Sequence, residues 1–142
     1  MAEVTYNIAK SRVATGLVVF GTTALKAVLV ITSKTGASDP DLATLAAIDA
    51  VGTVAFHTER VALTGVGVAV DNTNDRANID SANFAFAASA GVTALALIIY
   101  DASTDTSDTT RIPLFFYDTG FGAGLPLDGG LNVTVNDFAR VS

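Results

Sequence analysis

Residues 92–117 constrain the fold most, because they hold two apolar runs separated by a polar one. Residues 92–100 (VTALALIIY) and 111–117 (RIPLFFY) have the length and the branched or aromatic side chains of strands. Residues 101–110 (DASTDTSDTT) are too polar to bury. Neither apolar run alternates strictly, which is typical of strands covered on both faces. We therefore expect a long-looped β-hairpin near the centre of a sheet or sandwich.

The rest of the chain also favours β-structure. Residues 24–32 (ALKAVLVIT) form a second strong apolar run, which predicts another buried strand. Shorter strand candidates, separated by turn residues, are 17–20, 53–57, 59–63, 65–71, 77–79, 83–87 and 131–135. Many short strands with frequent turns are typical of sandwiches and barrels. The prediction is a mostly β chain: a single-domain antiparallel β-sandwich or β-barrel over residues 1–142, with possible extended N- and C-terminal contact segments.

One short helix is predicted at about residues 39–51. Asp39 before Pro40 resembles an N-cap followed by the first helical position, and Gly52 would end the helix. Residues 4–15 are ambiguous between strand and helix. They would form a short helix with Asn7 as N-cap and Gly16 as its stop.

Composition and charge narrow the classes of partner. Half of the 142 residues are hydrophobic and only 15% are charged, against roughly 25% in typical soluble domains. This fits a surface partly covered by other chains, or a compact β domain with a Ser/Thr-rich exterior. The net charge of −6 and the scattered basic residues predict no nucleic-acid partner. No apolar run approaches the roughly 20 residues that span a bilayer, so no membrane partner is expected, and no signal peptide is recognised.

Residues 65–71 alternate between valine and small residues. Val66, Val68 and Val70 fall on one face, and a face of glycine and alanine lies opposite. Such a small-residue face permits close approach of another backbone, within a sheet or between subunits.

Three short sequence patterns resemble sites with known chemistry. Residues 120–124 (GFGAG) resemble half of a phosphate-binding loop, but residues 125–129 (LPLDG) cannot open the helix such a loop requires. His57 is the only histidine and, with Glu59 nearby but no assigned nucleophile, makes no triad. The chain has no cysteine, which excludes disulfides and thiolate metal sites. Residues 132–134 (NVT) match a glycosylation sequon inside a predicted strand, and we discount it.

Acidic residues gather in two loops. Asp71, Thr73 and Asp75 alternate as in a calcium loop, but the glycine and the bidentate glutamate are missing. Asp101, Asp105 and Asp108 would surround a hard cation if their loop folded back, and a solvated hairpin tip is the commoner outcome. We assign no catalytic, cofactor-binding or metal site, and we expect no enzyme and no cofactor.

Three segments in order resemble a family of small structural proteins of tailed-phage virions. The first is Tyr6-Asn7-Ile8-Ala9-Lys10, followed by Gly16-Leu17 and residues 25–30 (LKAVLV). The second is residues 97–101 (LIIYD), a polar loop and residues 111–118 (RIPLFFYD). The third is residues 124–136 (GLPLDGGLNVTVN) with Phe138 and Arg140, and residues 63–71 fit the family's middle. The chain departs from the family at residues 18–21 (VVFG), where an acidic turn is usual, and in an Ala-rich helix region.

The resemblance implies a capsid decoration (cement) protein on the exterior of the capsid. Its partners would be the major capsid protein and other copies of itself, as a homotrimer, and the resemblance carries over no catalytic residue. The expected contact residues lie in the terminal segments and loops: Val4, Tyr6, Pro40, Phe121, Leu125 and Phe138.

Three alternatives stay open. A tail, neck or fibre-attachment protein of the virion would need similar contacts. A carbohydrate-binding adhesion module would need exposed aromatic residues, whereas Tyr100, Phe115, Phe116 and Tyr117 are expected to be buried. An enzyme would need a polar pocket containing His57 or aspartates with shifted pKa values.

Overall fold

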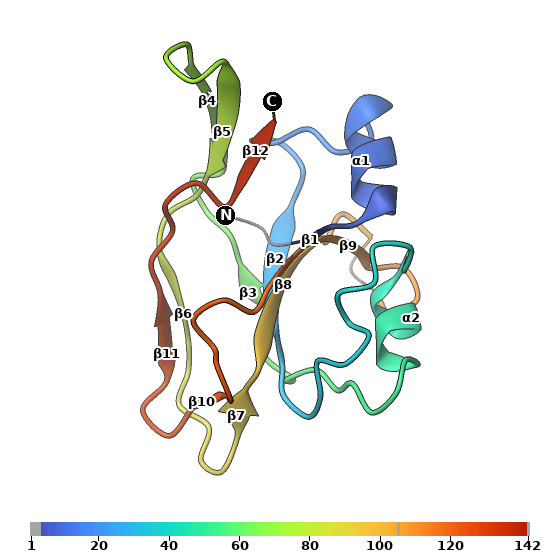
Figure 1. The fold of residues 1–142 in the computed structure, drawn as a ribbon, viewed down its shortest axis with the longest axis vertical. Coiled ribbons are helices and arrows are strands. Elements are labelled where there is room, and N and C mark those ends of the chain that lie inside the picture. The colour runs from blue at the N-terminus through green and yellow to red at the C-terminus, as the bar shows by residue number, and fades with distance from the viewer. Residues whose placement is uncertain (1–3, 105, 142) are drawn as a thin grey trace.

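A computed structural model describes residues 4–104 and 106–141 of the chain (Figure 1). Its main element is a five-stranded sheet with the order β1-β9-β8-β2-β3, in which every pairing is antiparallel. The strands are β1 (Val4–Thr5), β2 (Leu25–Val30), β3 (Val61–Ala62), β8 (Ala96–Asp101) and β9 (Ile112–Tyr117).

The predicted central hairpin is confirmed. β8 lies between β9 and β2, and all six of its residues are buried. β9 is buried from Pro113 to Phe116. Strands covered on both faces need no alternation of polar and apolar residues, which explains the continuous apolar runs. The predicted buried strand at 24–32 is also confirmed, as β2.

Pro113 occupies β9 because of an irregularity in the ladder. Ile99 pairs with Phe115 and Tyr100 pairs with Pro113, so the register shifts between the two β8 residues. Proline has no backbone N–H to donate to the hydrogen bonds between strands, so it is tolerated inside sheets mainly at bulges and edges. The bulge therefore lets an apolar strand that contains a proline sit beside the central one.

Three smaller sheets complete the β-structure of the described residues. β6 (Phe84–Phe86) pairs with β11 (Leu131–Val133), and β7 (Thr93–Ala94) pairs with β10 (Leu125–Pro126). β5 (Arg76–Asp80) lies between β4 (Gly67–Asp71) and β12 (Ala139–Val141). Figure 1 shows β6 and β11 on one side of the large sheet and the helices on the other. The predicted mostly β, antiparallel, sandwich-like fold is confirmed.

The described residues form two helices, α1 (Asn7–Ala14) and α2 (Leu45–Asp49), where one had been predicted. The ambiguous segment 4–15 is therefore helical over most of its length. Its N-cap position is Tyr6, and the Asn7 side chain instead donates to Asp41 at 2.6 Å. The Tyr6 hydroxyl donates to the carbonyl of Ala37 and ties the start of α1 to the 33–39 loop.

α2 is shorter than the predicted helix at 39–51. Asp39 does not cap it, because its carboxylate accepts from the backbone N–H of Asp41 at 3.0 Å and closes a local turn. Thr44 is the N-cap, and its hydroxyl oxygen accepts from the N–H of Ala47 at 3.1 Å. The Asp-Pro pair thus begins a turn, and the helix starts five residues after Pro40.

Two predicted short strands are wrong. Residues 17–20 form a turn after α1, in which the backbone N–H groups of Leu17 and Val18 donate to the carbonyl of Arg12 at 2.8 and 3.1 Å. Residues 53–57 contribute only an isolated bridge between Phe56 and Val30. In the C-terminal part, β11 alternates as predicted, with Leu131 and Val133 partly buried and Asn132 exposed.

Candidate interaction surface

The three-stranded sheet β12-β5-β4 has one apolar face. Residues paired directly across antiparallel strands point to the same side. Val68 pairs with Ile79, which pairs with Ala139, and Val70 pairs with Ala77. All five side chains therefore share a face, and each of them is apolar. The neighbouring positions Asp71 and Arg76 lie on the other face, where an ion pair joins them at 3.0 Å.

The body of the protein covers only half of this apolar face. The covered part lies on β5 and β12, where Ile79 and Ala139 are 1% and 3% exposed. On the edge strand β4, Val68 and Val70 are 52% and 74% exposed, although Val68 pairs directly with Ile79. Figure 1 shows the β4–β5 hairpin projecting past the rest of the molecule. We call residues 67–80 the arm.

A second set of exposed apolar side chains comes from α1 and from the turn that leads towards the base of the arm. Val13, Leu17 and Val19, from α1 and the turn after it, are 36%, 60% and 49% exposed. The turn lies against the residues leading into β4, since a Cβ built on Gly21 would be 3.4 Å from the carbonyl oxygen of Val66. We call Val13, Leu17, Val19, Val68 and Val70 the apolar end; they are the large hydrophobic side chains exposed among the described residues.

A groove of about 370 Å³ runs between α1 and β12. Its floor is apolar and includes Phe20, Ile79 and Phe115. We call it the α1–β12 groove, and it is lined by Thr5, Ala9, Lys10, Val13, Ala14, Phe20, Ile79, Phe115, Ala139 and Arg140. Val13 belongs to both the groove and the apolar end, so the two surfaces are continuous.

Charge differs between the groove and the arm. Lys10 and Arg140 are the charged residues among the groove's lining, and both are basic. Arg140 also lies 3.5 Å from Asp137, and the Lys10 ammonium donates to Asn7 at 3.1 Å. The arm carries three carboxylates and one guanidinium, which belong to Asp71, Asp75, Asp80 and Arg76.

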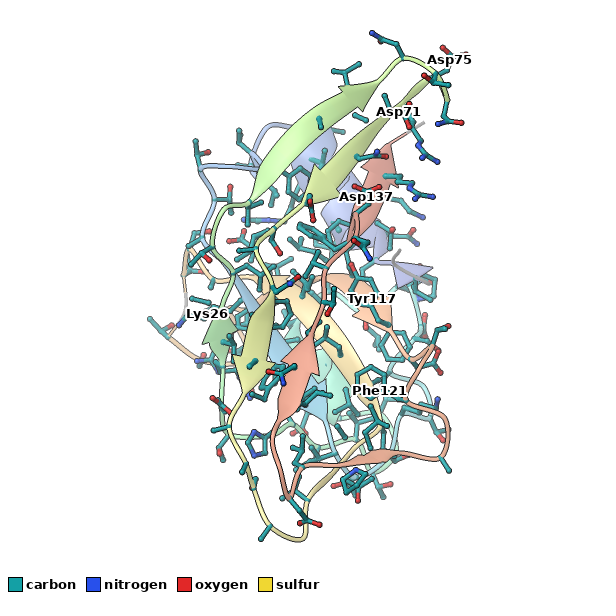
Figure 2. All side chains as sticks on the ribbon, turned by 90° about the vertical axis from the view of Figure 1, so that its left-hand side faces the viewer. Lys26, Asp71, Asp75, Tyr117, Phe121 and Asp137 are labelled. Atoms are coloured by element: carbon teal, nitrogen blue, oxygen red, sulfur yellow. The ribbon has the colours of Figure 1, made fainter. Side chains whose placement is uncertain are left out.

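Asp71 and Asp75 lie at the far end of the arm (Figure 2). A side-chain hydrogen bond from Asn74, followed by contacts with Arg76, lowers the pKa of Asp71 below its ordinary value. The Asp71 carboxylate is therefore charged at neutral pH.

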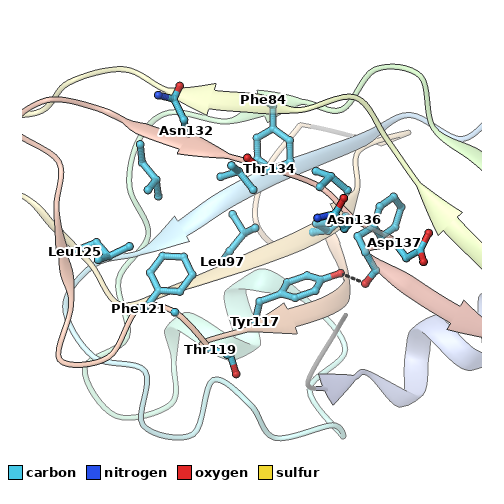
Figure 3. A pocket seen from close by; sticks show the side chains of 16 residues that line it. Phe84, Leu97, Tyr117, Thr119, Phe121, Leu125, Asn132, Thr134, Asn136 and Asp137 are labelled. Atoms are coloured by element: carbon cyan, nitrogen blue, oxygen red, sulfur yellow. Dashed lines mark hydrogen bonds between the residues drawn. The ribbon is translucent and has the colours of Figure 1, made fainter.

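A separate cavity of about 290 Å³ lies between β11 and the β8–β9 part of the large sheet (Figure 3). Most of its wall is apolar, including Leu97, Phe121 and Leu125. The Tyr117 hydroxyl points into this region and donates to the carbonyl of Phe138, which fixes the start of β12 over β9. Asp137 is the one titratable group besides Tyr117 among the described residues that line it.

The acidic loop residues lie beside arginines. Asp101 is 2% exposed and accepts from Arg12 at 2.7 Å, and it also accepts from the N–H of Ser103 at 2.9 Å. Asp108 lies 2.7 Å from Arg111 and 3.6 Å from Arg60. Asp105 lies outside the described residues. Within residues 4–104 and 106–141 no group of three or more His, Asp or Glu side chains is placed to hold a metal ion.

His57 is largely buried beside β2, where its backbone N–H donates to the carbonyl of Leu29 at 2.8 Å. Its Nδ1 accepts from the N–H of Glu59 at 3.3 Å. His57 lines neither the cavity nor the groove. Its ring therefore closes a local turn.

Of the six predicted contact residues, three are buried and three are at least partly exposed. Tyr6, Phe121 and Phe138 are 0%, 9% and 5% exposed, and the chain's own core accounts for their packing. Val4 and Leu125 are half-buried, and Pro40 is exposed. That any of the six touches a partner stays a prediction. The terminal contact segments extend into residues 1–3 and 142, which lie outside the described residues.

Sequence reasoning missed the apolar end as a surface. The alternation that places Val66, Val68 and Val70 on one face was visible in the sequence. The sequence did not show that β4 is an edge strand that projects past the body, because this position depends on the pairing of β5 with β12.

No family model, curated protein or solved structure matches this chain. Among the described helices, none combines the length and the apolar character required to cross a bilayer.

Proposed function

We propose that this protein is a structural component of a tailed-phage virion, a capsid decoration (cement) protein on the exterior of the shell. Its partners would be the major capsid protein and other copies of itself, as a homotrimer. The observation that carries the proposal is the apolar end: an uncovered apolar sheet face that continues into an apolar groove. The ordered resemblance along the sequence supports the same class of protein.

The physical requirements of a cement protein agree with this surface. Such a protein must hold neighbouring capsomers together through lasting contacts, and the cores of protein interfaces are depleted in charge. Val70, at 74% exposed, has an apolar side chain that only a partner would cover. A projecting arm also extends the reach of a small domain across a junction.

A tail, neck or fibre-attachment protein is the second candidate, because repeated contacts through an apolar surface would serve it equally. A carbohydrate-binding module is less well supported. Tyr100, Phe115 and Phe116 are buried and Tyr117 is half-buried, and the large hydrophobic side chains exposed in the described part of the chain are valine and leucine. Stacking on sugar rings needs aromatic faces. We propose no catalytic role.

The test is binding to phage shells assembled without this protein. We expect the wild-type chain to co-sediment with shells and to saturate at a copy number set by the capsomers. Leu17→Asp places a charge on a side chain that is 60% exposed, and it should weaken binding by about tenfold. The matched control Ala90→Asp, on the β6–β7 connection, should bind like wild type.

The outcomes separate the candidates. Saturation at the number of subunits in a neck or tail ring, measured by quantitative gel or cryo-EM, would favour the second candidate. Failure of the wild-type chain to bind shells would contradict the decoration role. Equal binding by Leu17→Asp and wild type would remove the apolar end from the contact.

A further inference from the structure

We propose that the arm of one copy of this chain docks into the α1–β12 groove of a second copy. The contact forms in solution and does not require a phage shell. It rests on the self-association included in the proposed function, and because it is measured without shells its failure is distinguishable from a failure to bind shells. The arm and the groove are different patches that meet at Ile79, so the contact joins unlike patches of the two copies.

Apolar complementarity is the first argument. The arm presents Val68 and Val70 with 52% and 74% of their surfaces exposed. The groove offers a floor that includes Phe20 and Phe115, with Val13 at its edge. Burying exposed valines against such a floor removes apolar area from water on both copies.

Charge complementarity is the second argument, and it favours the arm of a second copy as the segment that occupies the groove. The groove's lining carries two basic residues and no acidic one among the residues that the structure describes. The arm carries three acidic residues and one basic residue. Because each chain has a net charge of −6, two copies repel each other at long range. The basic groove is a surface that attracts the acidic arm of a second copy. Docking brings Asp75 at the arm's tip towards Lys10 on the groove's rim.

The same charges argue against a two-fold contact between arms. A two-fold contact uses the same patch on both copies. Arm against arm would bring the acidic tips together and leave the groove unused. Arm against groove joins unlike charges, either reciprocally across a two-fold axis or head-to-tail in a ring when the rotation between copies permits.

Cysteine cross-linking tests the contact directly, because the natural chain has no cysteine. Val70→Cys and Val13→Cys proteins, distinguished by a small mass tag, are mixed in equal amounts without shells and oxidised mildly. We expect the mixed dimer, with its disulfide between positions 70 and 13, to dominate. The control pairs Val70→Cys with Ala90→Cys, whose site is in the β6–β7 connection at the opposite end of the molecule from the arm (Figure 1).

Two results would overturn the proposal. One is a dominant dimer of two Val70→Cys chains, which would indicate that the arms of the two copies pack against each other. The other is a mixed dimer no more abundant than the control pair gives.

A double-mutant cycle in the cysteine-free chain tests the charges. Asp75→Asn and Lys10→Gln should each raise the dissociation constant of self-association by about threefold. Together they should raise it no further than either does alone, because both remove one interaction. Sedimentation velocity measures the association. A multiplicative loss in the double variant, or a wild-type chain that stays monomeric up to about 100 µM, would contradict the contact. Thermal melting of each variant checks that the fold is intact.

Discussion

At the scale of single residues, Gly130 shows where the backbone leaves no room for a side chain. It has a φ of +79°, and a Cβ there would lie 2.9 Å from the carbonyl oxygen of Phe86. That oxygen belongs to β6, which pairs with β11 immediately after the turn. Gly91 has a similar φ of +72°, but nothing lies within 4 Å of its built Cβ. Comparing alanine substitutions at these two positions therefore separates the effect of backbone strain from the effect of a steric clash.

We predict that Gly91→Ala lowers the free energy of unfolding by about 1 kcal/mol, the cost of a left-handed conformation. Gly130→Ala should lower it by about 3 kcal/mol, because the β6–β11 turn must also shift. Urea unfolding followed by circular dichroism measures both losses. Equal losses would show that the turn absorbs the added methyl group.

Tyr6 makes stability sensitive to alkaline pH. Burial, and then the negative charge of Asp39, raise the pKa of the Tyr6 phenol well above its ordinary value. The unfolded chain releases this proton near pH 10, whereas the folded chain retains it. Folding thus becomes less favourable as pH rises above about 10.

We predict that Tyr6→Phe reduces this loss of stability between about pH 9 and about pH 11. At pH 7 the same variant should cost roughly 1 kcal/mol, because the carbonyl of Ala37 loses its hydroxyl donor. Urea unfolding at several pH values gives both quantities. A pH dependence identical to that of wild type would assign the alkaline loss to other groups.

At the scale of elements, α2 depends on its cap. It spans only Leu45–Asp49, and helices this short are marginal in isolation. The Thr44 hydroxyl satisfies the N–H of Ala47, and the N–H groups of Leu45 and Ala46 donate to the carbonyls of Arg111 and Asp108. The loop between β8 and β9 therefore holds the start of the helix in place.

We predict that Thr44→Ala lowers the free energy of unfolding by about 1 kcal/mol. Thr44→Ser keeps the hydroxyl oxygen and should stay within about 0.5 kcal/mol of wild type. Chemical denaturation compares the two. Equal losses in both variants would mean that the threonine methyl group, and not the cap, stabilises α2.

At the scale of the whole molecule, stability should fall from the central sheet to the arm. β8 is buried along its length between two neighbours, whereas β4 is an edge strand whose middle residues, Val68, Ala69 and Val70, are exposed. Local opening is easiest where few buried contacts hold an element.

We predict that backbone amides of β8 exchange with solvent at least about a hundredfold more slowly than those of β4. Hydrogen exchange of dilute protein, followed by NMR or mass spectrometry, measures this. Uniform exchange across both strands would show that the arm unfolds only together with the body. Slower exchange of β4 at high protein concentration would be expected if the arm docks into a second copy.

The sequence by itself determined the interior of this protein. The apolar runs that became β8, β9 and β2 are long enough and uninterrupted enough to specify buried strands, and the polar stretch between β8 and β9 had to be a loop. It also limited the metal chemistry, since one histidine and no cysteine exclude thiolate and multi-histidine metal sites.

Only the tertiary structure decided the surface. Whether anything covers Val68 and Val70 depends on where the β4–β5 hairpin lies, and that is set by the pairing of β5 with β12 from the far end of the chain. The start of α2 likewise depends on carbonyl groups of the β8–β9 loop, which overrode the local signal at Asp39 and Pro40. Local pattern fixes which face of an element is apolar, but only long-range packing fixes whether anything covers it.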